Sequence, residues 1–219
     1  DYFSSNIYSD YTKSLGDHNF KIMAGFNAEL YRPSGLNGFG TDLISPDVPS
    51  LGLTQDNKKA SSWARERAIA GFFGRVNYNY KERYMLEANL RYDGSSRFVG
   101  DKRWGLFPSF SAGWNIARED FFRPLAGVIG TLKLRGSWGQ LGNNNTDKAN
   151  AWYPFYQNMI TGSANSGWLI DSKKQNTAQL PGIVNSLMTW ETIESWDIGL
   201  DFGLLDNRLT GSVLSLIHI

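Results

Sequence analysis

The chain of 219 residues contains no cysteine and only two histidines, His18 and His218. Without thiols, neither a disulfide framework nor a thiolate metal site can form. Two histidines leave no material for a Ser-His-Asp relay or for a metal site with several histidine ligands. The composition therefore opposes a hydrolase, and we expect no enzyme activity, no cofactor and no metal.

The chain also lacks an excess of charge of either sign and any long apolar run. Lys and Arg number 22 and Asp and Glu 21, a net charge of +1, so no nucleic-acid partner is expected. No apolar run approaches the roughly 18 residues that a membrane-spanning helix requires. No signal-peptide pattern opens the chain at Asp1, so we expect either a removed signal or an internal piece of a longer protein.

Aromatic residues, at 14%, and glycine, at 23 residues, are plentiful, which favours sheets and tight turns. Between Phe72 and Tyr92 apolar and polar residues alternate strictly. The polar phase consists of Arg75, Asn77, Asn79, Glu87, Asn89, Arg91 and Asp93. Because successive side chains of a strand point to opposite sides, this segment is predicted to be a hairpin with one apolar and one polar face.

The same two-residue alternation recurs along the chain and predicts about eight strands. Beyond the hairpin, the predicted strands cover Asn19 to Tyr31, Leu106 to Ile116, Leu132 to Gly139, Trp196 to Leu204, a return strand from Arg208, and a less regular first strand near Ile7 to Ser14.

Short and long connections between these strands take turns. Three are tight turns, at Leu15 to His18, Lys81 to Arg83 and Leu205 to Asn207, and Arg118 to Gly130 is a compact link. Between them fall Arg32 to Glu66, Ser95 to Arg103 and Leu141 to Thr189, two of which are far longer than a usual hairpin loop. In an up-and-down sheet this order puts all short turns at one end, as in outer-membrane barrels. Strands of roughly 11 to 14 residues also suffice for the 9 to 11 that cross a bilayer at a tilt.

The predicted fold class is all-β: an antiparallel up-and-down transmembrane β-barrel segment of about eight strands, forming an open curved sheet as a fragment. Alternating strands also occur in soluble sandwiches and lipocalin-like barrels, where the apolar face is the core. A soluble β-rich carbohydrate-binding or adhesion module is therefore the alternative. A small outer-membrane barrel enzyme is opposed by the histidine count.

Several ordered blocks carry a specific resemblance. They are Gly71 to Tyr78 leading into Tyr84 to Phe98, then Trp104 to Ser109, Ser111 to Ile116, Leu132 to Asn143, Trp190-Glu191 and Leu204 to Leu209. Together they resemble SusC/RagA-type TonB-dependent outer-membrane transporters over most of Ile7 to Val213.

The resemblance implies an importer in the outer membrane of a Gram-negative bacterium, taking up oligosaccharides or peptides too large for porins. It implies a barrel of about 22 strands around a plug, embedded in outer-membrane lipid. The implied partners are a SusD-like surface lipoprotein that closes like a lid and the TonB complex. Nothing in this sequence resembles the plug or the TonB-engaging segment. The resemblance therefore assigns energy coupling to the inner membrane to none of the residues present.

The resemblance weakens after Val213. Leu214, Leu216, Ile217 and Ile219 put apolar residues on both faces of the last strand. We therefore expect residues 1–213 to be part of a receptor β-barrel domain, and residues 214–219 to be a non-native tail from truncation or read-through.

Two sets of residues are candidates for function. The polar phase from Arg75 to Asp93 is expected to face the lumen, where solvation and hydrogen bonding to the plug are favoured over direct substrate contact. One long loop holds Trp152, Tyr153, Phe155, Tyr156 and Trp168. These rings either stack on sugars or pack against the lid, or they fill a small core of the loop itself.

Metal binding has little support in the loops. Asp42, Asp47, Asp56, Asp147 and Asp171 are spread without the spacing of a calcium loop.

Overall fold

The computed structural model describes residues 1–125, 127–145, 152–157, 159, 161–162, 169–181 and 187–218. The long strands are β1 (Tyr2–Leu15), β2 (His18–Tyr31), β5 (Arg67–Tyr80), β6 (Tyr84–Ser95), β7 (Trp104–Asn115), β8 (Ile129–Asn143), β13 (Glu191–Leu204) and β14 (Leu209–His218). The connections hold β3 (Ser34–Leu43), β4 (Thr54–Ala64), β9 (Thr161–Gly162), β10 (Leu169–Ile170), β11 (Lys173–Lys174) and β12 (Thr177–Ala178). Four 3-10 turns are described, η1 (Leu51–Leu53), η2 (Gly100–Arg103), η3 (Ile116–Arg118) and η4 (Asp120–Leu125).

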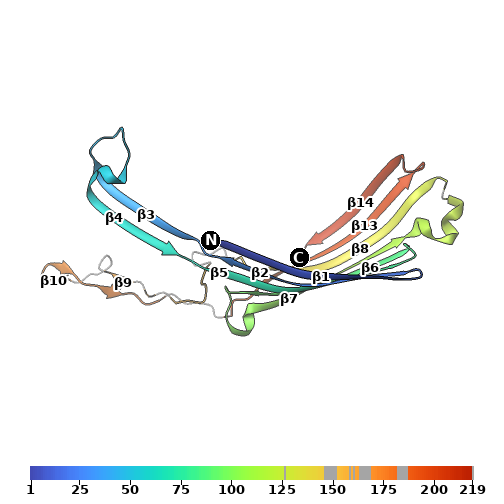
Figure 1. The fold of residues 1–219 in the computed structure, drawn as a ribbon, viewed down its shortest axis with the longest axis horizontal. Coiled ribbons are helices and arrows are strands. Elements are labelled where there is room, and N and C mark those ends of the chain that lie inside the picture. The colour runs from blue at the N-terminus through green and yellow to red at the C-terminus, as the bar shows by residue number, and fades with distance from the viewer. Residues whose placement is uncertain are drawn as a thin grey trace.

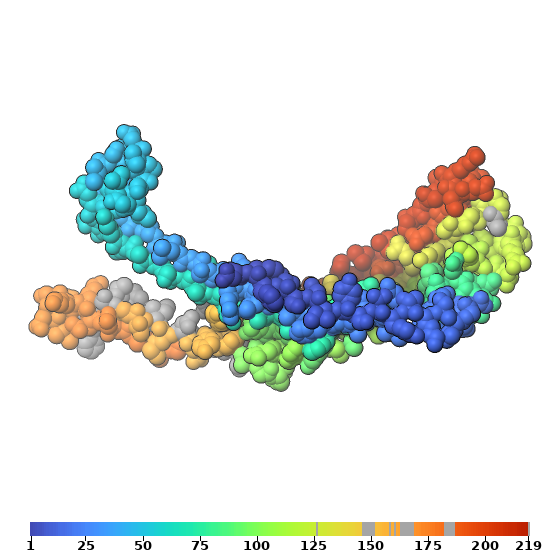
Figure 2. Space-filling view, viewed as in Figure 1, coloured from blue at the N-terminus to red at the C-terminus, as the bar shows by residue number. Residues whose placement is uncertain are grey.

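The long strands form one 8-stranded sheet in the order β1-β2-β5-β6-β7-β8-β13-β14, with antiparallel neighbours throughout. This confirms the predicted up-and-down sheet. Figure 1 shows that the sheet is curved along its length, and Figure 2 shows the same thin, bent profile in space-filling form. The described strands do not close on themselves, because β1 and β14 are the two ends of the order.

The pairing register aligns the apolar residues of neighbouring strands on one side of the sheet and the polar residues on the other. Directly opposite residues share a face, and Phe72 lies opposite Tyr92 while Arg75 lies opposite Asn89. The even-numbered apolar residues of β2 to β13 therefore form one continuous surface, and the odd-numbered, mainly polar residues form the other.

The apolar face is exposed rather than packed. Leu86, Phe110 and Ile198, on three different strands, are 52%, 53% and 66% exposed. Among the described residues, the buried apolar side chains are only Phe98, Phe107 and Phe122. A soluble protein would cover a surface of this extent with a second layer. The described part of the chain supplies none, so the apolar face requires a non-aqueous surrounding.

The polar face is hollowed. One cavity of about 550 Å³ is lined by residues from β1 through β13, including Thr12, Lys21, Glu87, Arg135 and Asp197. A second hollow, of about 690 Å³, lies over the apolar face, where Phe110, Trp138 and Ile198 are among its lining residues.

The long connections project from one end of the sheet. Residues 32–66, predicted as a plain loop, contain the antiparallel β3/β4 hairpin, which extends far beyond the sheet in Figure 1. Residues 144–190 hold two short strand pairs, β9 with β12 and β10 with β11. At the other end the β1–β2, β5–β6 and β13–β14 turns are tight, while the β7–β8 connection holds η3 and η4. Gly16 adopts a φ of +60° that favours glycine in the β1–β2 turn.

The last strand continues to His218 without interruption. On β14, Leu214 and Leu216 lie opposite Gly199 and Asp197, which puts two apolar residues on the polar face. The non-native origin of residues 214–219 stays a prediction. Across the described ranges, no helix has the length and apolar character needed to cross a membrane.

Candidate functional site

Hydrogen-bonded side chains connect β5 and β6 across the polar face. Arg75 Nε donates to Asn89 Oδ1 at 2.6 Å. Asn77 Nδ2 and Asn89 Nδ2 donate to the two carboxylate oxygens of Glu87, at 2.5 and 2.8 Å. Strand pairing brings these residues together, because Arg75 lies opposite Asn89 and Asn77 opposite Glu87. The result is a charge-balanced ladder.

A second ladder crosses β8, β13 and β14. Arg135 Nε donates to Asp201 Oδ2 at 3.1 Å, and Ser212 Oγ donates to the other oxygen of Asp201 at 2.7 Å. Ser137 Oγ donates to the carboxylate of Asp197. Donors on neighbouring strands therefore engage both carboxylates, which suits a wetted wall better than a general base held free for catalysis.

Nearer the long connections, Arg91 forms a bidentate ion pair with Asp93, in which Nε donates to Oδ2 at 3.0 Å and Nη2 donates to Oδ1 at 2.9 Å. Asp93 also lies against Gly71 on β5, where a Cβ would overlap its Oδ1. Glycine at position 71 thus leaves the space that this ion pair occupies.

Beyond β6, two long connections meet in the best-buried part of the chain. Ser95 Oγ accepts hydrogen bonds from the Arg97 backbone N–H at 3.3 Å and from Asn144 Nδ2 at 3.2 Å. The Phe98 ring lies 5.6 Å from the Trp190 ring, whose Nε1 donates to the Arg103 carbonyl at 2.9 Å. We call this region the loop junction.

The loop junction contains a buried guanidinium. Arg97 is only 5% exposed, and its Nη1 donates to the Asn144 carbonyl at 2.7 Å. Among the described residues, no acceptor takes a hydrogen bond from its Nε. Burial and the charge of Arg67 both lower the pKa of Arg97.

The aromatic residues predicted as loop contacts divide into two groups. Trp152 packs on the wall, with its ring 5.8 Å from Tyr31. Tyr156 packs on Tyr153 and Phe155, at 6.3 and 5.3 Å between ring centroids. The Tyr153 hydroxyl also accepts a hydrogen bond from the Glu66 backbone N–H at 2.9 Å. Trp168 lies outside the described residues.

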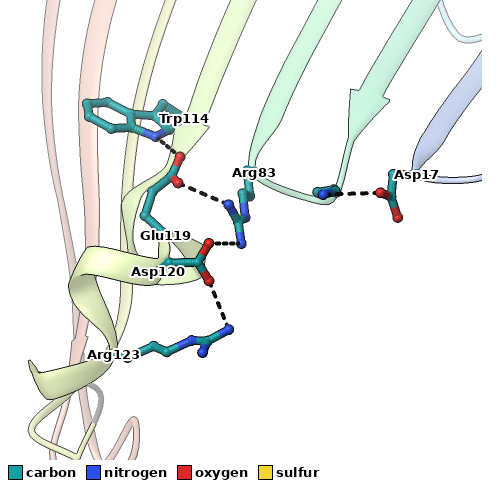
Figure 3. Close-up of polar contacts among 7 residues, drawn as sticks. Asp17, Arg83, Trp114, Glu119, Asp120 and Arg123 are labelled. Carbon is teal, nitrogen blue, oxygen red and sulfur yellow. Dashed lines mark hydrogen bonds and ion pairs between the residues drawn. The ribbon is translucent and has the colours of Figure 1, made fainter.

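At the opposite end, an ion-pair network holds the β7–β8 connection against the β5–β6 turn (Figure 3). Glu119, 8% exposed, accepts hydrogen bonds from Trp114 Nε1 at 3.0 Å and from Arg83 Nη1 at 3.3 Å. Arg83 Nη2 also pairs with Asp120 at 3.2 Å. Hydrogen bonds from Tyr84 and Trp114, with the charge of Arg83, lower the pKa of Glu119. This network fixes the rim at the short-turn end.

The seven polar-phase candidates of β5 and β6 all lie on one face in register, as the alternation predicts. Their role as lumen lining stays a prediction. Sequence reasoning missed the cationic residues of the long-loop end, Arg65, Arg67 and Arg97. The only local signal was their clustering near strand ends, because the burial of Arg97 depends on Asn144, far along the chain. Among the described residues, no group of three or more His, Cys, Asp or Glu could hold a metal ion.

Comparison with known proteins places these features in a family context. A family model described as TonB dependent receptor-like, beta-barrel matches residues 1–219. TonB-dependent receptor SusC of Bacteroides thetaiotaomicron is 34% identical over 211 residues, covering 96% of this chain and 20% of the relative. TonB-dependent receptor P3 of Formosa agariphila is 30% identical over 207 residues, covering 94% of this chain and 20% of the relative.

Solved structures agree on the fold. The RagAB peptide transporter superposes with a TM-score of 0.82 at 20% identity, covering 98% of this chain and 23% of that one. The RagAB peptide importer in its open-open state gives a TM-score of 0.78 at 19% identity, covering 99% of this chain and 23% of that one.

Proposed function

Because the chain belongs to the TonB dependent receptor-like β-barrel family, we propose that it forms part of the wall of a transporter that imports bulky nutrients such as oligosaccharides or peptides. The chain spans about a fifth of the length of the curated relatives it matches. Import is therefore proposed for a longer protein, in which these residues supply eight neighbouring strands.

The location of the chain follows from its family. TonB-dependent receptors of the SusC and RagA type are outer-membrane β-barrel proteins, and this chain is a segment of such a barrel in the outer membrane.

One observation carries the proposal: the sheet has an uncovered apolar face on one side and a hydrogen-bonded polar face on the other. Leu86 and Phe110 are more than half exposed on one side, while Glu87 and Arg135 border a hollow on the other. In a barrel wall the first face contacts hydrocarbon and the second a polar lumen. The polar ladders then keep the wall wet and offer hydrogen bonds to a plug.

The long connections are the proposed contacts for substrate and lid. Trp152, Tyr153, Phe155 and Tyr156 stand at the end from which these connections project. Support for a lid comes from relatives named SusC and RagAB, which suggest a SusD- or RagB-like lipoprotein partner. TonB coupling is proposed for parts of the protein outside this chain. Both an oligosaccharide and a peptide cargo are compatible with these relatives.

The proposed role is transport without catalysis. The family is one of TonB-dependent receptors, not of enzymes. The alternative of a soluble carbohydrate-binding module has less support, because its core would have to bury the even-numbered apolar residues. None of those apolar side chains is buried in the described strands, and Leu86, Phe110 and Ile198 are more than half exposed.

The proposal is tested in the native bacterium with the whole gene. Deleting the gene is expected to abolish uptake of at least one class in a panel of fluorescently labelled neutral oligosaccharides, acidic oligosaccharides and peptides. Deleting TonB should abolish the same uptake, while a porin-sized monosaccharide enters normally. Unchanged uptake of the whole panel after gene deletion would contradict import.

A further inference from the structure

The long-loop end of the wall carries a buried guanidinium with one donor left unpaired. Arg97 Nη1 donates to the Asn144 carbonyl and to Asn145 Oδ1, while its Nε has no hydrogen-bond partner among the described residues. Arginine binds a carboxylate in two-pronged fashion through adjacent N–H groups. Arg91 does so with Asp93 through Nε and Nη2. The equivalent edge of Arg97 lacks a described carboxylate.

A second guanidinium reinforces the positive charge. Arg67, half-buried at the start of β5, is brought beside Arg97 by the β5–β6 pairing, which continues past Ile69 and Ser95 to the hydrogen bond from the Ser96 N–H to the Ala68 carbonyl at 2.9 Å. Its charge also lowers the pKa of Arg97. Of the acids nearby, Asp93 is paired with Arg91, and Glu66 is paired with Arg32 at 2.6 Å. Glu29, opposite Ile69 on β2, forms no described ion pair with either Arg67 or Arg97. Two like charges held together without a described counter-ion attract an anion.

Aromatic rings alternate with these cations. The guanidinium carbon of Arg67 lies 5.6 Å from the Tyr31 ring, and the Tyr31 ring lies 5.8 Å from Trp152. Arg65 lies 5.1 Å from the Trp63 ring and 5.7 Å from the Trp152 ring. The mouth cluster is the row Trp63, Arg65, Trp152, Tyr31, Arg67 and Arg97.

We propose that the mouth cluster binds a carboxylate-bearing oligosaccharide, with Arg67 and Arg97 holding the carboxylate and Trp152 and Tyr31 contacting the sugar rings. Aromatic faces suit flat pyranose surfaces, while a buried guanidinium edge demands a charged acceptor. A neutral sugar satisfies the rings but leaves the cations uncompensated. This inference rests on the proposed import function and narrows its substrate class.

Binding is measured on the full-length transporter in detergent, by calorimetry with a hexamer of galacturonic acid. Maltohexaose is the neutral probe and an acidic hexapeptide is the peptide probe. We expect the acidic sugar to bind at least about tenfold more tightly than either, since charge-assisted hydrogen bonds are the stronger kind. Its affinity should fall as salt rises.

Three variants assign the effect to the cluster. Arg67→Gln, at a side chain with no hydrogen bond among the described residues, should weaken binding of the acidic hexamer by about tenfold. Arg97→Lys keeps the charge but removes the two-pronged edge, and should weaken binding to a similar extent. Arg123→Gln, the same charge change at the short-turn end, is the matched control and should leave affinity unchanged.

Several outcomes overturn the inference. Equal affinity for maltohexaose, preference for the acidic peptide, or full affinity in Arg67→Gln each excludes acidic-sugar recognition at this cluster. Import itself is judged separately: if the gene deletion still abolishes uptake of a neutral sugar or peptide, the transporter stands and only the substrate class is wrong.

Discussion

At the scale of single residues, Glu119 shows how one carboxylate can fix a rim. It bonds Trp114 of β7 and Arg83 of the β5–β6 turn. Because its folded pKa is lowered, the stabilisation is fully present above the ordinary pKa of 4.5 and is lost as pH falls through the lower folded value. Acidification below that range should therefore loosen residues 116–125.

The variant Glu119→Gln tests this at neutral pH. Hydrogen exchange of the backbone amides from 116 to 125, measured on the full-length barrel in detergent, should be faster in the variant. The protection factors there, in which the intrinsic pH dependence of amide exchange is divided out, should also lose their acid dependence. Asp101→Asn, at an exposed carboxylate in η2, is the control. Protection factors with an unchanged pH profile in Glu119→Gln would refute the role of this carboxylate.

Gly71 gives a second test at the same scale. A methyl group there would overlap the carboxylate of Asp93, whereas one at Gly74 on the same strand meets only the Met23 carbonyl, at an ordinary 3.7 Å. Gly71→Ala should displace Asp93 from Arg91 and destabilise the barrel by about 1–3 kcal/mol. Gly74→Ala should cost much less. Thermal unfolding of the full-length protein compares them, and equal losses would show that the ion pair is unimportant.

At the scale of strands, the two faces should differ in their tolerance of charge. Leu90→Arg, in the middle of β6 on the apolar face, should cost about 2–4 kcal/mol if that face contacts hydrocarbon. Ser111→Arg, on β7 opposite Glu87, introduces the same side chain on the polar face and should cost little. Assembly of each full-length variant in lipid is the measurement, and equal tolerance would reverse the facing assignment.

The same scale shows what sequence could predict. The sheet strands were predicted because a two-sided environment imposes alternation on each of them. The predicted Asn19 to Tyr31 differs from β2 by one residue, and Lys81 to Arg83 is the observed turn. β3 and β4 were missed because an exposed two-stranded ribbon has no buried face, and Thr54–Ala64 carries no regular apolar phase.

The candidate site was predictable to a similar degree. The face on which a residue lies follows from local periodicity, so the shared face of the polar residues from Arg75 to Asp93 could be predicted. The mouth cluster depends on contacts between distant segments, such as Tyr31 with Trp152 and Arg97 with Asn144. No local pattern encodes these contacts.

At the scale of the whole molecule, the chain is an incomplete enclosure. In the described sheet β1 and β14 each have one strand neighbour, so both leave a row of backbone groups unpaired. Open edges and an exposed apolar face both promote association. Expressed alone in buffer, the 219-residue chain should aggregate, and size-exclusion chromatography should recover it only with detergent. A monodisperse monomer in plain buffer would contradict the lipid-facing assignment.

The two long interruptions within the sheet also bear on how the wall is built. Pairing of β2 with β5 spans residues 32–66, and pairing of β8 with β13 spans residues 144–190. Closing a long segment costs more chain entropy than forming a tight hairpin, and distant pairings form more slowly. Three units should therefore fold early: the β1–β2 hairpin, the four-stranded β5–β8 meander and the β13–β14 hairpin. Pairing of β2 with β5 and of β8 with β13 is then the slow stage of barrel assembly.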